Sequence, residues 1–344
     1  MLMRGGLKLR ERIEKYFHVY HHERGDDFER YYVLPLVNLN SEEVQYLFQE
    51  LSENYDVRLK THFGEFILEL KRRKESYRLN VILFIATFAS ITFTGSTFYG
   101  SFDLILGLKF AVALMFVLGS HEMGHFIASK RWGMKASLPY FIPFPTIIGT
   151  LGAVIRQRGV IKSRRALLEI GASGPLAGVV AALIVTYIGL KLPVPELSVE
   201  GGGGIMLGEP LLFRFVAGVA GFTGEYIHPV AFAGWVGMFV TALNLIPVGQ
   251  LDGGHVMRAM LGNRADAISR IFPFVLLAAG YFFKDSGGIW FFWAILAFFF
   301  SMQRHPKPYD DSPLPLRYLF LGMVTFAVGI LCFTPVPFKF VEGL

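Results

Sequence analysis

The sequence contains a single cysteine, Cys332, among its 344 residues. One thiol cannot form a disulfide within the chain, and it cannot supply the several thiolates of a structural zinc site. Any metal that the protein holds must therefore be bound by histidine and carboxylate side chains. Charge is also scarce, because only 17% of the residues are charged, and these gather in short clusters beside long uncharged runs.

Apolar residues are abundant instead. Hydrophobic residues make up 53% of the chain, 34 residues are phenylalanine, and the mean hydropathy is +0.45. This composition is too apolar for one soluble domain and indicates a membrane protein with several spans. The net charge of +6 comes largely from lysine and arginine clusters beside the apolar runs. It therefore indicates membrane topology and contact with the lipid bilayer, and we expect no nucleic-acid partner.

Residues 1–78 are polar and predict a small soluble α+β domain. Asn40 and Glu43 form a capping-box pattern at the start of a helix, and two runs rich in strand-forming residues follow. The helix is predicted over residues 41–54, and the strands over about 57–62 and 66–70. Arg4 and Lys8 precede no apolar core, so we do not expect a secretory signal, and the first span is expected to direct insertion.

The rest of the chain predicts an all-α polytopic membrane protein with about six to seven transmembrane helices. The apolar runs cover about residues 79–98, 104–130, 166–190, 229–245, 267–283, 288–302 and 316–334. A shorter run at 211–222 contains Arg214 and predicts an interfacial or re-entrant helix. A basic cluster at 71–74 precedes the first span, so the positive-inside rule predicts that the N-terminal domain lies in the cytosol. We expect the protein in the cell membrane.

A non-helical segment separates the second and third of these runs. Residues 138–145 hold three prolines, and residues 146–155 are apolar, β-branched and interrupted by glycine. Apolar, non-helical backbone is tolerated at membrane depth only where protein buries it or where it lines a cavity. We therefore predict a short membrane-associated β-hairpin or re-entrant loop. Its free strand edge could hold an extended peptide by strand addition, although ordinary interfacial packing explains the segment equally well.

The motif His121-Glu122-Met123-Gly124-His125 ends a long apolar run. On a helix this spacing puts the two imidazoles one turn apart on the same face, where both can bind one zinc ion. Glu122 then lies beside the metal and can take a proton from its water. Three ionisable residues at the end of a membrane-length helix are costly unless they act together, so we favour a metal site over a helix end that faces headgroups.

A catalytic zinc ion takes three protein ligands and keeps one position for water. A third histidine in the extended metzincin pattern would fall at position 131, which is Arg131. Asp252 is the best carboxylate, because the predicted topology returns it to the membrane depth of the paired histidines and Gly253 lets the backbone approach closely. Its alternative role is to cap the helix that follows.

Two more polar residues belong near this predicted site. Asn244 is a candidate donor to the oxyanion that develops during peptide hydrolysis, and its alternative role is an interhelical hydrogen bond. His255 follows Asp252 by three residues and is predicted to be a neighbour of the site rather than a ligand.

Taken in order, these segments resemble the site-2 proteases, the intramembrane zinc metalloproteases of peptidase family M50. The resemblance is carried by His121–His125 and by Asn244-x-x-Pro247-x-x-x-x-Asp252-Gly253. Residues 143–145, 149–153 and 171–175 look closest to the branch shared by archaea, bacteria and plastids. The resemblance implies His121, His125 and Asp252 as ligands of one zinc ion and Glu122 as the catalytic base.

The resemblance also implies an intramembrane metalloprotease core over 79–260. The soluble N-terminal domain over 1–78 and the additional C-terminal transmembrane helices over 261–344 depart from the minimal core of the family. Transmembrane proteins are the implied substrates, cut near the cytosolic side, often after another protease has trimmed them; the oligomeric state is open. Two other classes compete with this reading. A metal or proton transporter would need a polar path across the membrane. An inactive protease-like scaffold would be favoured by loss of the base, but Glu122 is present.

Overall fold

The computed structural model describes residues 9–62, 64–73, 76–194, 204–303 and 305–341. The described residues divide into two compact units. Unit 1 takes Met1–Tyr77, Gly133–Ala136 and Gln157–Val160, and unit 2 takes Arg78–Trp132, Ser137–Arg156 and Ile161–Leu344. The features predicted at Arg4, Lys8 and Lys74 lie outside the described residues.

Unit 1 contains a four-stranded antiparallel sheet in the order β1-β2-β4-β3. The strands are β1 (Phe17–Arg24), β2 (Phe28–Pro35), β3 (Tyr55–His62) and β4 (Glu65–Arg72), and helix α2 spans Glu42–Ser52. Apolar residues of α2 and of the strands alternate into one buried cluster that includes Val44, Tyr31 and Leu68. Helix α2 therefore packs on one face of this sheet. The predicted strands at β3 and β4 are confirmed, whereas β1 and β2 were not predicted.

The predicted helix cap at Asn40 is wrong by one residue. Ser41 has extended backbone angles, and its side chain accepts a hydrogen bond from the backbone N–H of Val44. A hydroxyl at this position satisfies one of the free donors of the first turn, so the helix begins at Glu42. The helix also ends earlier than predicted, at Ser52, because β3 begins at Tyr55.

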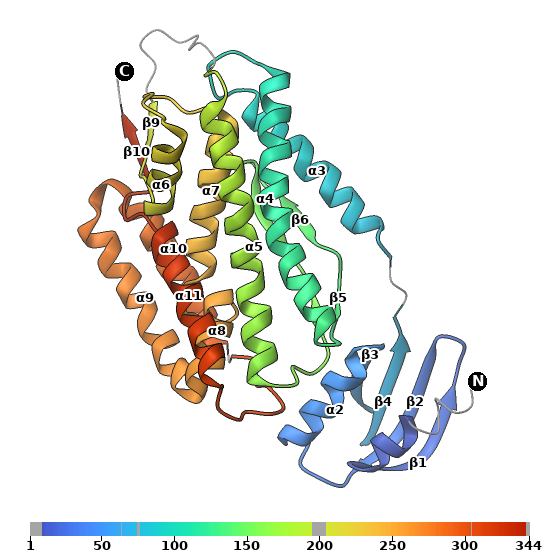
Figure 1. Ribbon diagram of the computed structural model, residues 1–344. Helices are drawn as coiled ribbons and strands as arrows, with labels where there is room; N and C mark the ends of the chain where they lie inside the picture. The colour runs from blue at the N-terminus through green and yellow to red at the C-terminus, as the bar shows by residue number, and fades with distance from the viewer. Residues whose placement is uncertain (1–8, 63, 74–75, 195–203, 304, 342–344) are drawn as a thin grey trace. The chain divides into compact units, whose positions relative to one another are not determined.

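Unit 2 is built mainly of helices (Figure 1). They are α3 (Arg78–Gly95), α4 (Leu104–Arg131), α5 (Arg164–Lys191), α6 (Leu211–Ala220), α7 (Pro229–Asn244), α8 (Asp252–Leu261), α9 (Ala265–Phe282), α10 (Gly287–Met302) and α11 (Leu316–Cys332), with short 3₁₀ turns at Gly262–Arg264 and Lys284–Ser286. Among the described residues, four helices are long and apolar enough to cross a membrane: α3, α4, α5 and the continuous helix Asp252–Phe282. Helices α7, α10 and α11 are apolar but shorter, so the predicted number of spans stays a prediction.

Helices α4, α5 and α7 lie side by side and form the centre of unit 2 (Figure 1). Gly124 of α4 shows how closely they pack, because a Cβ atom at this position would lie 2.4 Å from the carbonyl oxygen of Ser173 on α5. Such contact distances leave no room for a larger residue. The backbones of α4 and α5 therefore approach each other directly beside His121 and His125.

The segment between α4 and α5 forms short antiparallel ribbons. Strands β6 (Tyr140–Pro143) and β7 (Thr150–Val154) pair as a hairpin, and β5 (Lys135–Ala136) pairs with β8 (Gln157–Arg158). Asn80 of α3 donates from Nδ2 to the carbonyl oxygens of Leu138 and Pro139, at 2.9 and 3.0 Å. The predicted hairpin is therefore present and is held against α3, while its depth in a membrane stays a prediction. A further ribbon pairs β9 (Gly204–Leu207) with β10 (Phe338–Val341).

Candidate metal centre

Helix α4 carries the paired histidines on one buried face. His121, Glu122 and His125 are 5%, 7% and 6% exposed. The two imidazole rings lie edge to face with their centroids 4.9 Å apart, and their Nε2 atoms are separated by 3.2 Å. The spacing of four residues therefore brings both nitrogens to one point, as the helical periodicity requires.

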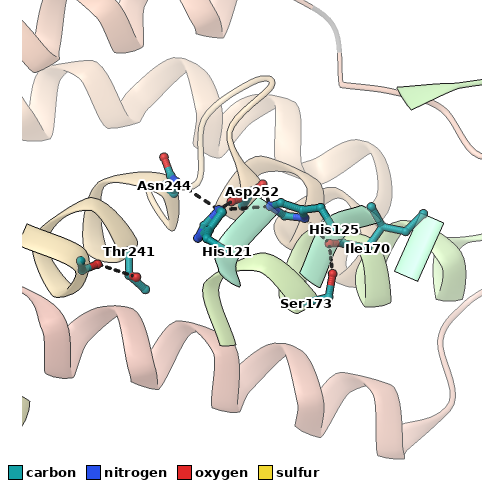
Figure 2. A network of polar contacts seen from close by, with 8 residues as sticks. His121, His125, Ile170, Ser173, Thr241, Asn244 and Asp252 are labelled. Atoms are coloured by element: carbon teal, nitrogen blue, oxygen red, sulfur yellow. Dashed lines mark hydrogen bonds and ion pairs between the residues drawn. The ribbon is translucent and has the colours of Figure 1, made fainter. Parts of the chain in front are cut away.

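Asp252 reaches this point from the first residue of α8 (Figure 2). One carboxylate oxygen lies 3.2 Å from Nε2 of His121, and the other lies 3.2 Å from Nε2 of His125. The residue that caps α8 is Leu251, and no side chain makes a capping bond there. The capping role considered for Asp252 is therefore wrong, since its carboxylate is turned to the two imidazoles instead.

The orientation of His125 is fixed by the backbone of α5. Its Nδ1 atom lies 2.8 Å from the carbonyl oxygen of Ile170. A carbonyl oxygen only accepts, so Nδ1 carries the proton and the neutral ring keeps a lone pair on Nε2. A backbone partner of this kind sets both the tautomer and the direction of a ligating imidazole.

Two glycines of α5 make room for the imidazoles. A Cβ atom at Gly174 would lie 2.1 Å from Nε2 of His125, and one at Gly178 would lie 3.0 Å from Nδ1 of His121. The two glycines are four residues apart, like the two histidines, so the facing turns of α4 and α5 match one another. Gly174 and Gly178 were not predicted as part of the site, and the spacing of four that they share with the histidines is the signal that could have identified this cradle.

The donor atoms fit a metal ion. His121, His125 and Asp252 each offer a ligand atom, and these atoms all lie within 4.8 Å of one another. Lone pairs and carboxylate charge facing one another at 3.2 Å repel unless a proton or a metal cation lies among them. Two imidazoles and one carboxylate form a donor set of hydrolytic zinc sites, which keep a further position for water. In the part of the chain that the structure describes, no other group of His, Cys, Asp and Glu meets this description.

Asn244 is brought to the same place at the end of α7. Its Nδ2 atom lies 3.4 Å from Nε2 of His121, a long contact (Figure 2). Between Asn244 and Asp252 the chain turns back tightly, because a Cβ atom at Gly253 would lie 2.2 Å from the carbonyl oxygen of Leu245. This close turn explains how residues 244 and 252 both reach the paired histidines.

Three further polar residues lie in or near the motif: Glu122, Glu169 and His255. No donor among the described residues bonds to the buried carboxylate of Glu122. Glu169, the nearest acidic residue downstream of the motif, accepts a hydrogen bond of 2.9 Å from the indole of Trp132. His255 is not a member of the metal-binding group. The structure therefore brings together Glu122, Asn244 and the three predicted ligands.

Comparison with known proteins identifies one matching family and several relatives. The family model described as Peptidase family M50 matches residues 109–283. The protein named "Probable zinc metalloprotease EGY2, chloroplastic" from Oryza sativa subsp. indica is 30% identical over 249 residues, which cover 68% of this chain and 44% of the rice protein. Its Arabidopsis thaliana counterpart of the same name is 30% identical over 248 residues, which cover 68% and 43%.

A third relative, "Probable zinc metalloprotease EGY1, chloroplastic" from Arabidopsis thaliana, is 32% identical over 183 residues, which cover 49% of this chain and 32% of the relative. The chain thus spans less than half the length of the relatives it matches. No solved structure matches the chain.

The glycine cradle predicts the effect of one added methyl group. Gly174→Ala places a Cβ atom against Nε2 of His125, so the imidazole must turn away and metal affinity should fall by roughly 10- to 100-fold. Titration of the purified protein with Co²⁺, followed by visible absorption, measures this affinity. Gly119→Ala on α4 is the matched control, because no atom lies within 4 Å of the new Cβ. Equal affinities for the two variants would contradict the assigned cradle.

Proposed function

Because the chain belongs to peptidase family M50, we propose that it is an intramembrane zinc metalloendopeptidase that hydrolyses a peptide bond in or near a transmembrane helix. The observation that carries this proposal is the contact of the two Asp252 oxygens with Nε2 of His121 and of His125, one oxygen to each ring. The names of the relatives also support it, since each is named a probable zinc metalloprotease.

His121, His125 and Asp252 would hold one zinc ion. Zinc in such a site polarises a substrate carbonyl and lowers the pKa of a bound water toward neutrality. The protein keeps the donor atoms in place through the bond from His125 to the Ile170 carbonyl and through the glycine cradle on α5. No thiolate takes part, in agreement with the single cysteine, which is buried in α11.

Glu122 is proposed as the general base. It follows His121 directly on α4, it is buried, and its carboxylate has no donor among the described residues. A carboxylate in this state can accept the proton of the attacking water and pass it to the leaving amine. The burial of the surrounding side chains excludes bulk water, which strengthens every charge interaction at the site.

Asn244 is proposed to stabilise the developing negative charge on the substrate carbonyl oxygen. Its amide Nδ2 carries donors and lies at the edge of the group, 3.4 Å from Nε2 of His121. A donor that is fixed in advance costs little reorganisation when the charge appears. The position of Asn244 at the end of α7, beside the tight turn to α8, supports such fixation.

The membrane arrangement follows from the positions of the charges. We propose six to seven spans in the cell membrane, with the hairpin β6–β7 at membrane depth and the N-terminal unit in the cytosol. Helix α4 ends with Lys130 and Arg131, ten residues after His121, which is about 15 Å along the helix. The site is therefore proposed to lie near the cytosolic side.

Transmembrane proteins are the proposed substrates, and their cleavage is proposed to be part of regulated proteolysis. A helical substrate must unwind locally before its carbonyl can reach a buried site, because intrahelical bonds hide the backbone. The hairpin β6–β7 offers strand edges that could bind an unwound segment by strand addition.

Transport of metal ions or protons is less well supported. A transporter needs ionisable groups along the whole path across the membrane. Residues 110–120 of α4, 170–190 of α5 and 229–244 of α7 contain no Asp, Glu, His, Lys or Arg. These stretches of the three central helices therefore provide no continuous path of ionisable groups across the membrane.

The role of Glu122 separates an active protease from an inactive scaffold. Glu122→Gln keeps the size of the side chain and removes the base, so cleavage should slow by about 10²- to 10⁴-fold while zinc remains bound. The assay follows cleavage of a model transmembrane substrate by the purified protein in detergent, together with zinc content. Glu169→Gln is the matched control, because its carboxylate bonds to Trp132 and lies outside the group. Cleavage that resists a zinc chelator, or equal rates for Glu122→Gln and wild type, would reject the mechanism.

Asn244 gives a separate prediction. Asn244→Ala should lower kcat by about 10²- to 10³-fold and leave zinc content and KM nearly unchanged, because the amide acts on charge that appears only in the transition state. Steady-state kinetics with the same substrate measure the two constants. An unchanged kcat with a lower melting temperature would show that Asn244 is an interhelical hydrogen-bonding residue instead.

A further inference from the structure

Residues 305–311, here named the C-terminal strap, lie in the connection from α10 to α11 and pair with residues 161–164, at the start of α5. The backbone N–H groups of Tyr309 and Asp310 donate to the carbonyl oxygens of Ile161 and Lys162, at 2.8 and 3.0 Å. The N–H of Arg164 donates in return to the carbonyl oxygen of Asp310, at 3.2 Å. These bonds join the strap to the start of α5 like a short parallel strand pair.

The strap also holds the end of α8 through an ion pair. Arg258, which is 2% exposed, directs both terminal nitrogens to the carboxylate of Asp311, at 3.0 and 3.2 Å. This two-pronged geometry fixes the direction of the guanidinium as well as its position. A second arginine joins the same helices, because Nε of Arg164 donates to the carbonyl oxygen of Ala259 on α8, at 2.7 Å.

A third contact attaches the strap to α9. Nδ1 of His305 lies 2.7 Å from a carboxylate oxygen of Asp266, and the His305 side chain is 2% exposed. The strap is therefore bound to α5, α8 and α9. Helix α8 supplies the carboxylate of the metal centre, and α5 supplies its glycine cradle and the Ile170 carbonyl.

The position of Asp252 depends on the rotation of α8. One carboxylate oxygen must face each imidazole, and a helix turns by about 100° per residue, so a modest rotation removes one of the contacts. Arg258 lies six residues further along the same helix, roughly 9 Å from Asp252. The ion pair at this end opposes rotation, because the guanidinium of Arg258 is buried and would lose its charged partner if α8 turned.

We propose that Asp311 is a positioning residue, which fixes the rotation of α8 through Arg258 and thereby holds Asp252 in register with His121 and His125. The C-terminal strap is then required for a complete metal centre, although it supplies no ligand. This proposal rests on the proposed function, because it concerns the affinity of the site for zinc.

The experiment measures the zinc affinity of the full-length protein in detergent by competition with a chelator. Asp311→Asn removes the charge from Arg258 and should weaken zinc binding about 10-fold, and Asp311→Glu should restore most of the loss. Asp310→Asn is the matched control: it removes the same charge from the neighbouring position, where the carboxylate accepts hydrogen bonds from Ser312 and from no other described residue, and it should bind zinc like wild type.

The outcomes are distinguishable. Wild-type affinity for Asp311→Asn, or an equal loss for Asp310→Asn, overturns the positioning role while the proposed function stands. Absence of zinc binding by the wild type overturns the proposed function, and the positioning role with it. If Asp311→Asn does not fold, Arg258→Lys decides: it keeps the charge and loses the two-pronged contact, so weaker zinc binding supports the role and unchanged binding rejects it.

Discussion

The contact between Asp252 and the paired imidazoles is the constraint on which the rest of unit 2 depends. It joins α4 to α8, and the two residues in contact, His121 and Asp252, are 131 positions apart in the chain. A partly buried carboxylate and two buried imidazoles held this close together are costly unless a cation lies among them. The tight turn after α7, the glycines of α5 and the bond from His125 to Ile170 all serve to bring these groups together and to keep them oriented.

This arrangement explains why small residues are so frequent between the central helices. At Gly174 of α5 the imidazole of His125 occupies the space where a Cβ would be, and at Gly124 of α4 the backbone carbonyl of Ser173 on α5 occupies it. Close packing of this kind also removes water and limits the movement of the donor atoms. The same packing that stabilises the helices in an apolar solvent therefore defines the geometry of the candidate metal centre.

The sequence predicts the features that follow from local residue spacing or from the order of the membrane spans. The spacing of His121 and His125 predicts a shared helix face, and charge clusters beside apolar runs predict that Asp252 returns to the same depth. The role of Gly174 was missed, because it depends on which turn of α5 faces His125. Strands β1 and β2 were also missed, because β1 consists largely of histidine and charged residues after Val19, and in β2 the charged Glu29 is buried while Leu34 is exposed, which hides the alternation.

X-ray absorption at the zinc edge of the purified, zinc-loaded protein tests the central claim most directly. The account predicts one zinc ion per chain, with only nitrogen and oxygen ligands at about 2.0–2.2 Å and the multiple-scattering signature of two imidazoles. It also predicts that Asp252→Ala removes an oxygen ligand and keeps both imidazoles. A sulfur ligand, fewer than two imidazoles, or an unchanged spectrum for Asp252→Ala would contradict it.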